Sequence, residues 1–403
     1  MIKFSFSGET YQTGRIIGNI KGSGSGPVLM FIAGIHGNEP TGVLALQQVF
    51  EELATEQTRI RGHLIGVSGN LNALAKNTRF ISKDLNRIWN RDFLNLYRAQ
   101  AANQAVTNPE PDQVGTEYAI AEHAEQIELF QLIEPLISQG RQAYFIDLHT
   151  TSAPSVPFIA INDQLDNRGF ALNFPVPTVL GIEEYLEGPL LSYLNDFGPV
   201  ALAFEAGQHD DPESVKTHKA FVYRAMVEAG VLKEAQIPGH DSSVEKYQQR
   251  LKELGHAHHD FFEVVFRWPL SPGDQFSMNP GYNNLSPIKK GEVLARDKNG
   301  EIRAPMSGQI FMPLYQPSGE DGFFIVRRVP YWALQLSSGL RKINFDRCLT
   351  LLPGVSKSKQ YPDALVVNKH VARFLAKQIF HLLGYRRKTA DGDDMVFSRR
   401  EIT

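Results

Sequence analysis

The chain has 403 residues, of which 42% are hydrophobic and 21% charged, and its formal net charge is -3 at pH 7. This composition is that of a globular protein with about two or three domains, and the small net charge argues against nucleic acid and membrane surfaces as partners. The N-terminus has no apolar signal core, and no apolar run approaches the ~20 residues that span a bilayer. The single cysteine, Cys348, allows no internal disulfide, so the sequence predicts a cytoplasmic protein.

The start of the chain predicts strand, helix and strand in succession, which is the signature of an α/β sheet. Residues 2–20 alternate weakly and predict an early strand pair, and the glycine-rich segment 21–27 is interpreted as a flexible turn. The apolar run 28–35 predicts a short buried strand. A helix is expected over 41–55, where apolar residues recur at helical spacing, and a second strand over 63–67.

His36 and Glu39 follow directly after the first buried strand. In an open α/β sheet, ligands bind where the strands end. An imidazole nitrogen and a carboxylate oxygen suit zinc, and a catalytic zinc keeps three protein ligands and one open position. An isolated His-x-x-Glu is more often an ordinary strand end, so the zinc interpretation requires a third ligand at another strand end.

The segment 77–87 is polar and lacks helical periodicity. It contains Arg79, Asn86 and Arg87. An arginine fork can bind a carboxylate through two hydrogen bonds or stabilise an oxyanion that develops on a carbonyl. The alternative is a solvated loop with scattered charges.

A second buried strand is expected over 143–148, after a polar surface excursion over 91–112 and a long helix over 117–138. This strand ends at His149. Asp147 lies two residues before His149, a spacing that points both side chains to the same side of a strand. A metal-bound histidine commonly donates its other ring N–H to a carboxylate, and Asp147 is the candidate partner.

Further short strands are expected over 157–163 and 177–182, and an apolar run over 198–204 leads into Glu205. A carboxylate at the end of a buried strand beside zinc would act as a general base and acid. The alternative is a glutamate that pairs with a nearby arginine. His209 is interpreted as part of the loop that follows.

Several of these motifs together resemble the succinylglutamate desuccinylase/aspartoacylase family, a branch of the zinc carboxypeptidase-like hydrolases. The resemblance covers about residues 28 to 210. It is carried by four linked motifs: His36-Gly37-Asn38-Glu39, Asn77-x-Arg79 with Asp84-Leu85-Asn86-Arg87, Asp147-Leu148-His149-x-Thr151, and Glu205-Ala206-Gly207.

The resemblance implies one zinc ion per chain, with His36, Glu39 and His149 as its ligands. It also implies that Glu205 is the general base and acid. The expected reaction is hydrolysis of an amide by zinc-activated water, from which Glu205 takes a proton that it passes to the departing amine.

The resemblance assigns the basic segment to the substrate. Arg79 is expected to polarise the scissile carbonyl, and Asn86 and Arg87 to bind the substrate's carboxylate. Two positions depart from the family pattern. A substrate-binding arginine expected shortly before the base corresponds to Asn195, and a tyrosine from the C-terminal domain has no clear counterpart, although Tyr315 lies in the right region. These departures weaken the case for N-acetylaspartate itself as the substrate.

The second half of the chain differs in kind. A helix over 215–234 is expected to close the hydrolase domain, and a boundary near 235–243 is followed by a helical segment to about residue 254. The tract His256-Ala257-His258-His259-Asp260 is interpreted as a solvated linker, since histidine-rich tracts are weak evidence of a metal site. Short strands with regular turn signals from Phe261 onward predict a small all-β domain.

This all-β region resembles the β-domain that follows the hydrolase domain in the family and is similar in shape to biotinyl-carrier barrels. It lacks a Met-Lys-Met attachment site, so biotin is not expected. Residues 315–323 are the candidate for substrate specificity. An amphipathic helix is expected over 365–383. Whether this helix packs on the chain's own body or docks against a second copy is left open, and the charged stretch 385–403 is expected to be loosely ordered.

The predicted fold is therefore α/β: a mixed twisted sheet with helices on both faces, zinc carboxypeptidase-like, followed by a small all-β domain and a C-terminal helix. The expected domains are a zinc hydrolase over 1–240, the all-β domain over 255–345, and a helical extension over 346–403.

The favoured function is a zinc-dependent amidohydrolase that deacylates an N-acyl amino acid or a related small amide. The alternatives are a metallocarboxypeptidase that removes a C-terminal residue and a catalytically silent zinc-binding protein.

Overall fold

The structure is a computed structural model that describes residues 1–103, 120–238, 244–255, 260–358, 364–368, 380–391 and 394–399. The histidine-rich tract 256–259 and most of the helix predicted over 365–383 lie outside these ranges.

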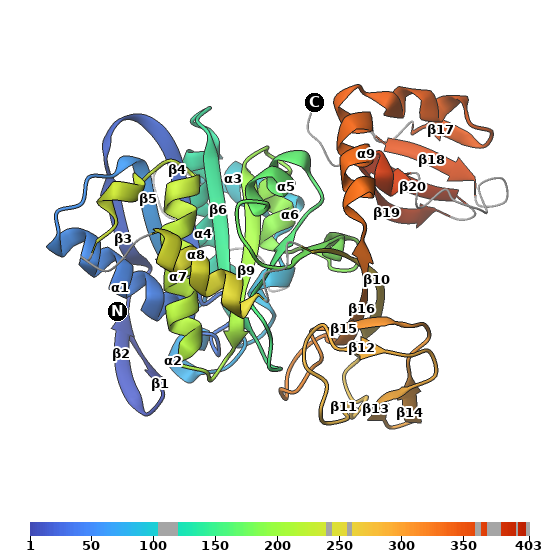
Figure 1. Ribbon diagram of the computed structural model, residues 1–403, viewed down its shortest axis with the longest axis horizontal. Coiled ribbons are helices and arrows are strands. Elements are labelled where there is room, and N and C mark those ends of the chain that lie inside the picture. The colour runs from blue at the N-terminus through green and yellow to red at the C-terminus, as the bar shows by residue number, and fades with distance from the viewer. Residues whose placement is uncertain are drawn as a thin grey trace.

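The described residues form a mixed α/β domain built on a large sheet, with further β-structure after it (Figure 1). The sheet has 11 strands, in the order β12-β15-β16-β10-β8-β7-β9-β6-β4-β5-β3. Strands β4, β5, β6 and β9 are mutually parallel, whereas β3 pairs antiparallel with β5 and β7 pairs antiparallel with β9. This arrangement confirms the predicted fold class. The strand bounds are β3 (Ile16–Lys21), β4 (Ser23–Ala33), β5 (Arg61–Ser68), β6 (Ala143–Thr151), β7 (Phe158–Ile161), β8 (Thr178–Leu180), β9 (Val200–Gln208), β10 (Phe261–Pro269), β12 (Pro287–Ile288), β15 (Gly308–Phe311) and β16 (Asp321–Val329).

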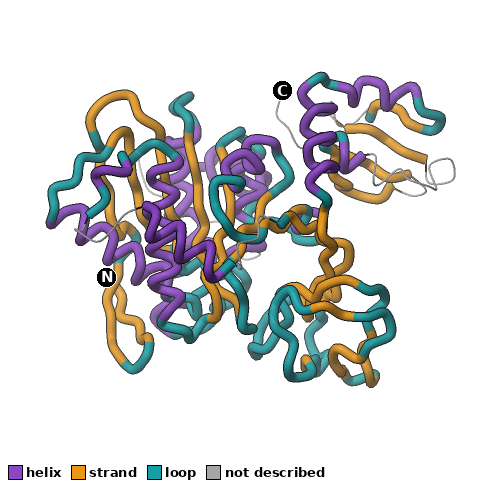
Figure 2. Tube along the Cα trace, viewed as in Figure 1, coloured by secondary structure: helices purple, strands orange, loops and turns teal. Residues whose placement is uncertain are grey.

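Helices cover both faces of this sheet because its central strands bury alternate residues on opposite sides. In β4, Leu29 and Phe31 belong to one apolar core, and Val28 and Met30 belong to the other. Figure 2 shows the helices on either side of the strands. The first core contains residues of α1 (Thr41–Thr55), α2 (Leu71–Lys76), α5 (Leu165–Ala171), α7 (Glu213–Glu228) and α8 (Val244–Leu254), and the second contains residues of α3 (Arg91–Asn103), α4 (Ala121–Ile137) and α6 (Leu190–Asn195).

The predicted elements of this domain are mostly present, and the differences have simple causes. The turn expected over 21–27 is largely strand, because β4 begins at Ser23 and reaches the parallel ladder with β5 through an irregularity between Ser23 and Val28. The polar excursion expected over 91–112 begins as α3, whose Leu94 is fully buried. The remaining short elements are the hairpin β1 (Ile2–Phe6) and β2 (Glu9–Thr13) and the 3₁₀ turns η1 (Leu85–Arg87), η4 (Ile182–Glu184) and η5 (Glu234–Gln236).

The all-β region shares the large sheet with the hydrolase domain. β10 pairs parallel with β8 at Phe261 and Thr178, and β16 pairs antiparallel with β10. β15 and β12 continue the same sheet. A separate three-stranded sheet consists of β11 (Ser277–Met278), β13 (Val293–Asp297) and β14 (Gly300–Arg303).

The C-terminal segment contains a four-stranded sheet, so the prediction of a helical extension with a helix from residue 365 is wrong at these positions. Leu365 and Val367 lie in β18, where their alternation buries them in the core of the module. The apolar run Leu365-Val366-Val367 suits a strand, because β-branched side chains pack well on a pleated surface. The elements are α9 (Tyr331–Lys342), η6 (Phe345–Leu351), β17 (Val355–Lys357), β18 (Ala364–Asn368), β19 (Tyr385–Asp391) and β20 (Asp394–Arg399).

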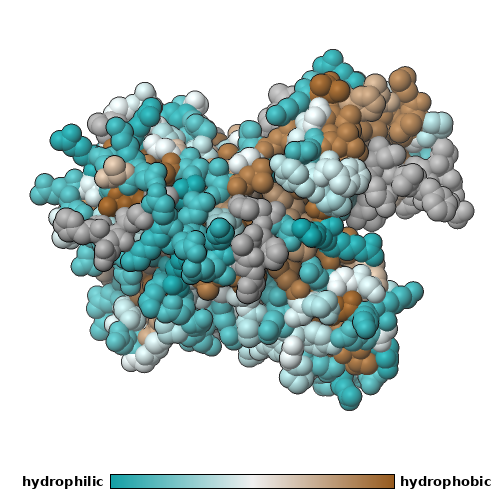
Figure 3. All heavy atoms as spheres, viewed as in Figure 1, coloured by the Kyte–Doolittle hydropathy of each residue, from teal (hydrophilic) through white to brown (hydrophobic). Residues whose placement is uncertain are grey.

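The stretch from Tyr385, expected to be loosely ordered, forms the hairpin β19–β20. This C-terminal module contacts the hydrolase domain through Arg341, whose guanidinium lies 2.8 Å from the Asp163 carboxylate. Figure 3 shows that apolar residues gather on the surface of the module. Its exposed apolar side chains include Leu336, Ile343, Phe345 and Leu351. No helix within the described ranges has the length and apolar character needed to cross a membrane.

Candidate active site

Three parallel strands deliver the predicted site residues to one edge of the sheet. β4, β6 and β9 run in the same direction, so their carboxyl ends lie at the same edge (Figure 1). His36 and Glu39 lie in the turn after β4, and His149 and Glu205 lie near the ends of β6 and β9. His149 and Glu205 are register partners in the ladder.

The turn that carries His36 and Glu39 packs tightly against α2. Gly37 is required there, because a Cβ at this position would lie 2.0 Å from the Ala73 carbonyl carbon. The Gly37 N–H donates to the Arg79 carbonyl at 3.1 Å, which ties this turn to the basic loop. The Glu39 N–H donates to the His36 carbonyl at 3.1 Å.

The three predicted metal ligands converge. The Glu39 carboxylate lies between the two imidazoles: its Oε1 is 2.9 Å from His36 Nδ1 and its Oε2 is 3.0 Å from His149 Nδ1. One ligand atom from each residue can be chosen so that all lie within 4.8 Å of one another, and all three residues are buried. Two imidazoles and a carboxylate at this separation could hold one divalent ion.

A carboxylate holds the other ring nitrogen of each histidine. Asp84 Oδ1 lies 3.0 Å from His36 Nε2, and Asp147 Oδ2 lies 2.7 Å from His149 Nε2. Both Nδ1 atoms therefore face Glu39. The sequence predicted this role for Asp147 and did not assign one to Asp84, because the contact between Asp84 and His36 links distant segments without a spacing signal.

The electrostatics of the cluster favour a cation. Burial alone would raise the pKa of Glu39, but His36 and His149 hold it well below its ordinary value. Burial alone would lower the pKa of His149, but Asp147 and Glu39 raise it well above its ordinary value. The Glu39 carboxylate thus stays ionised and attracts positive charge, and nitrogen and oxygen donors of this kind are the set that zinc accepts.

The basic loop places Arg79 beside this cluster. One guanidinium nitrogen lies 3.1 Å from the Asp84 carboxylate and another 3.5 Å from that of Glu39. Burial alone would lower the pKa of Arg79, but Asp84 and Glu39 raise it above its ordinary value. Arg79 lines the cavity over the cluster, so its charge faces the place where a substrate carbonyl could lie.

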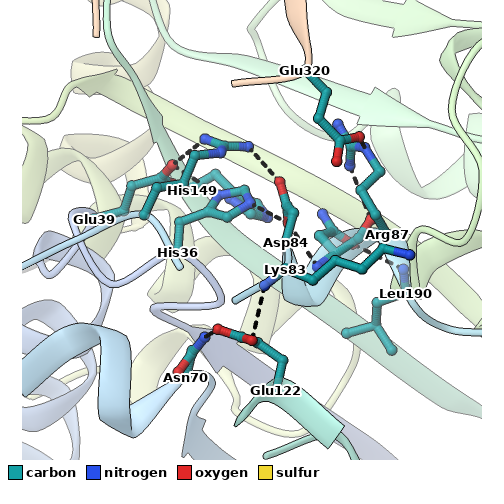
Figure 4. Close-up of polar contacts among 12 residues, drawn as sticks. His36, Glu39, Asn70, Lys83, Asp84, Arg87, Glu122, His149, Leu190 and Glu320 are labelled. Carbon is teal, nitrogen blue, oxygen red and sulfur yellow. Dashed lines mark hydrogen bonds and ion pairs between the residues drawn. The ribbon is translucent and has the colours of Figure 1, made fainter. Parts of the chain in front are cut away.

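A fully buried carboxylate from α4, Glu122, shapes this loop. It accepts hydrogen bonds from the backbone N–H groups of Ile81 and Ser82 at 2.6 and 3.1 Å. The Lys83 N–H and the Asn70 amide also donate to it, at 3.0 and 3.3 Å (Figure 4). Its place in an amphipathic helix gave no sequence signal for this role. Glu122 is the group that holds the chain between Arg79 and Asp84 in position.

Glu122→Gln should destabilise the protein and lower turnover. The amide offers one acceptor oxygen and puts an N–H donor against backbone donors, and each buried donor left without a partner costs about 1–3 kcal/mol. Urea unfolding and kcat measurements check this, with Glu128→Gln on the exposed face of the same helix as the control. Equal stability and equal turnover in the two variants would contradict the assigned role.

Glu205 is buried beside the ligand cluster, with 5% of its surface exposed. Its Oε2 has no hydrogen-bond partner among the described residues. Burial raises the pKa of Glu205 to about 8, and the nearby His149 opposes this shift. Among the described residues, Arg79 forms ion pairs with Glu39 and Asp84 but not with Glu205. The structure therefore does not support the alternative in which Glu205 pairs with an arginine.

Asn86 and Arg87 lie in the turn η1 and line the same cavity as Arg79. Asn86 Oδ1 accepts a hydrogen bond from the Leu190 N–H at 2.9 Å, so its amide nitrogen is the group that can donate to a ligand. Arg87 lies near two acidic side chains of the all-β region, with Glu320 Oε2 3.8 Å from its Nε and Asp321 Oδ2 3.5 Å from its Nη2 (Figure 4).

One cavity joins these groups. It is lined by all of the predicted ligands and by Glu205, Arg79, Asn86 and Arg87. Gln316, Glu320 and Asp321, which belong to the predicted specificity segment 315–323, also line it, as do His209 and Thr150, to which the sequence assigned no role.

Several sequence expectations about this cavity are resolved. His209, interpreted as loop, lines the cavity and lies 2.8 Å from the Thr150 hydroxyl, and burial lowers its pKa. Asn195 is not among the lining residues, and its amide donates to the Pro199 carbonyl at 3.2 Å. The Tyr315 hydroxyl donates to the Asn279 carbonyl at 2.8 Å and does not line the cavity, although Gln316 to Asp321 contribute four lining residues.

Comparisons with known proteins agree with this geometry. The family model of the succinylglutamate desuccinylase/aspartoacylase catalytic domain matches residues 25–120, the segment that carries His36, Glu39 and Arg79. Succinylglutamate desuccinylase from Photorhabdus laumondii is 30% identical over 122 residues, which cover 30% of this chain and 33% of that protein. The enzyme of the same name from Pseudomonas putida is 37% identical over 62 residues, 15% of this chain and 18% of its own. The matched segments thus span a third or less of these relatives.

Solved structures share the fold over most of the chain. Succinylglutamate desuccinylase from Vibrio parahaemolyticus has a TM-score of 0.51 at 15% identity, covering 76% of this chain and 83% of that one. A succinylglutamate desuccinylase/aspartoacylase from Rhodobacter sphaeroides has a TM-score of 0.53 at 16% identity, covering 77% and 88%. The family model of the succinylglutamate desuccinylase/aspartoacylase catalytic domain thus matches one segment of this chain, and the solved structures share its fold.

Proposed function

We propose that the protein is a zinc-dependent hydrolase that cleaves the amide bond of an N-acyl amino acid. The observation that supports this most directly is a buried carboxylate, Glu205, with an oxygen that lacks a partner in the described structure, next to a His36–Glu39–His149 cluster that fits one zinc ion. A purely structural metal site is closed by four protein ligands and has no use for an adjacent unpaired base.

Zinc, when bound, would supply a Lewis acid and lower the pKa of water towards about 7. In the proposed reaction, Glu205 accepts a proton from the attacking water, and the water oxygen bonds to the amide carbonyl carbon. Arg79 donates to the oxyanion that forms on this carbonyl. Glu205 then delivers its proton to the nitrogen as the C–N bond breaks, which releases a carboxylic acid and an amine.

Asn86 and Arg87 are proposed to orient the substrate. A guanidinium matches the geometry of a carboxylate, and the Asn86 amide can add a further hydrogen bond. Asp84 and Asp147 are proposed to fix the ring orientations of the two histidines, so that Nδ1 of each is presented to the metal.

The zinc-loaded protein should contain one zinc per chain and hydrolyse N-acetyl or N-succinyl amino acids faster than dipeptides. A chelator should remove both the metal and the turnover, and added zinc should restore both. His149→Ala should lose the metal, whereas His63→Ala, on strand β5 and outside the cavity, should keep it. Metal analysis and a turnover screen check this. A zinc-containing protein that hydrolyses only peptides, or nothing, would refute the proposed activity.

A further inference from the structure

The carboxylate-binding arginine lies between two acidic groups of its own chain. Arg87 Nη2 is 3.5 Å from Asp321 Oδ2, and Arg87 Nε is 3.8 Å from Glu320 Oε2. Asp321 also pairs with Arg267, which holds it at the start of β16. Both distances to Arg87 exceed those of a close charge-assisted hydrogen bond, which are about 2.7–2.9 Å. The arginine can therefore still bind one carboxylate, but any further negative charge nearby would face Glu320 and Asp321.

The described lining residues offer few cations to a second carboxylate of a substrate. Among the described lining residues, Arg79 and Arg87 are the two guanidinium groups, and Arg79 is already held between Glu39 and Asp84. The imidazole of the lining His209 already has a partner in the Thr150 hydroxyl, 2.8 Å away. Asn195, the counterpart of a substrate-binding arginine in the family pattern, is absent from the lining and carries no charge.

The wall beside Arg87 is apolar. The chain from η4 to the start of α6 packs directly on the turn that holds Asn86 and Arg87. In this packing the Trp89 N–H donates to the Gly188 carbonyl at 3.0 Å, and the Leu190 N–H donates to Asn86. The cavity residues contributed by this chain and by the all-β region opposite are mostly apolar: Ile182, Leu186, Leu191, Met312, Leu314 and Phe324.

These observations bear on what can lie next to a carboxylate held by Arg87. In an N-acyl amino acid, the side chain branches from the same carbon as the α-carboxylate. If Arg87 and Asn86 hold the α-carboxylate, the side chain enters the adjoining apolar wall. An ionised side chain there would lose its hydration without gaining a partner, which is strongly unfavourable.

We propose that the site selects N-acyl amino acids with an apolar side chain, and that Glu320 and Asp321 act as specificity residues that reject dicarboxylates. This inference rests on the proposed function and deepens it. Repulsion of the wrong substrate by a fixed charge adds to the attraction of the right one by the apolar wall.

The test compares three N-acetyl amino acids with the zinc-loaded protein: N-acetylleucine, N-acetylasparagine and N-acetylaspartate. Asparagine and aspartate are nearly equal in size and differ in charge, whereas leucine and asparagine differ in polarity. The expected order of kcat/KM is leucine, then asparagine, then aspartate. The step from leucine to aspartate should be at least tenfold, about the range over which apolar pockets discriminate.

Two variants separate the roles of charge and shape. Glu320→Gln should raise the ratio of kcat/KM for N-acetylaspartate to kcat/KM for N-acetylleucine by about threefold to tenfold, as expected for removal of a partly exposed like charge. Asp321→Asn should act in the same direction, with circular dichroism to verify the fold because Arg267 loses a partner. Glu301→Gln, an acidic residue of β14 outside the cavity, is the matched control and should alter none of the three rates.

The outcomes distinguish the two levels of proposal. N-acetylaspartate turned over as fast as N-acetylleucine would overturn the specificity inference and leave the deacylase proposal in place. If neither variant changes kcat/KM for N-acetylaspartate, Glu320 and Asp321 do not have the proposed role. No hydrolysis of any N-acyl amino acid by the zinc-loaded protein would overturn both.

Discussion

Glu205→Gln should retain zinc and lose nearly all turnover. The amide keeps the size of the side chain but cannot accept and return a proton, and general acid–base catalysis contributes about 10²–10⁴ to a rate. The variant should fold normally, because the Glu205 Oε2 makes no hydrogen bond among the described residues that the substitution would break.

Zinc content and kcat measured on the same preparation check this prediction. Glu213→Gln is the matched control, since this glutamate is half-exposed at the start of α7 and pairs with Lys216 outside the cavity. Glu213→Gln should keep full turnover. If Glu205→Gln holds zinc and still turns over at a rate close to that of the unchanged protein, the base is another group, and His209 would be the next candidate because it lines the same cavity.

Arg79→Met should lower kcat by about 10²–10³, the effect of removing one donor from an oxyanion site. The reason is that the Arg79 guanidinium is the cation of the cavity that lies next to the ligand cluster, 3.5 Å from Glu39. KM should change much less than kcat, because the charge on the carbonyl oxygen develops in the transition state and not in the bound substrate.

Steady-state kinetics with one N-acetyl amino acid separate kcat from KM. Arg303→Met, an exposed arginine of β14, is the control for loss of a guanidinium and should leave both constants unchanged. Added guanidinium ion should partly restore kcat in Arg79→Met if the defect is the missing donor. A rise in KM at constant kcat would instead show that Arg79 only binds the ground state.

The strands that carry the site could be predicted from the sequence because each one has a clear local sequence pattern. Each of the apolar runs that end at His36, His149 and Glu205 predicts a buried strand with a polar group at its end. Parallel pairing of β4, β6 and β9 then brings these ends together. The three predicted ligands are adjacent in the structure, and their role as ligands stays a prediction.

Other parts of the site depend on contacts between distant segments and left no local mark. Glu122 serves a loop 40 positions earlier in the chain, and Asp84 reaches an imidazole 48 positions away. Glu320 and Asp321 meet Arg87 only because β16 joins the large sheet through β10. The C-terminal helix was misassigned for a different reason: the apolar residues from Leu365 satisfy a helical spacing, but Val366 and Val367 also suit the strand that the structure contains.

Because the sheet is continuous, a change of substrate specificity through the all-β region depends on how β10 pairs with β8. β10 enters beside β8 with Phe261 opposite Thr178, and β16 then carries Asp321 and Phe324 to the cavity. A slip of one residue at this seam would turn every side chain of the entering strand to the other face. An all-β region taken from a relative could therefore transfer its preference only if it arrived in the same register, and a chain cut before residue 261 would leave β8 as a bare edge open to pairing with other molecules.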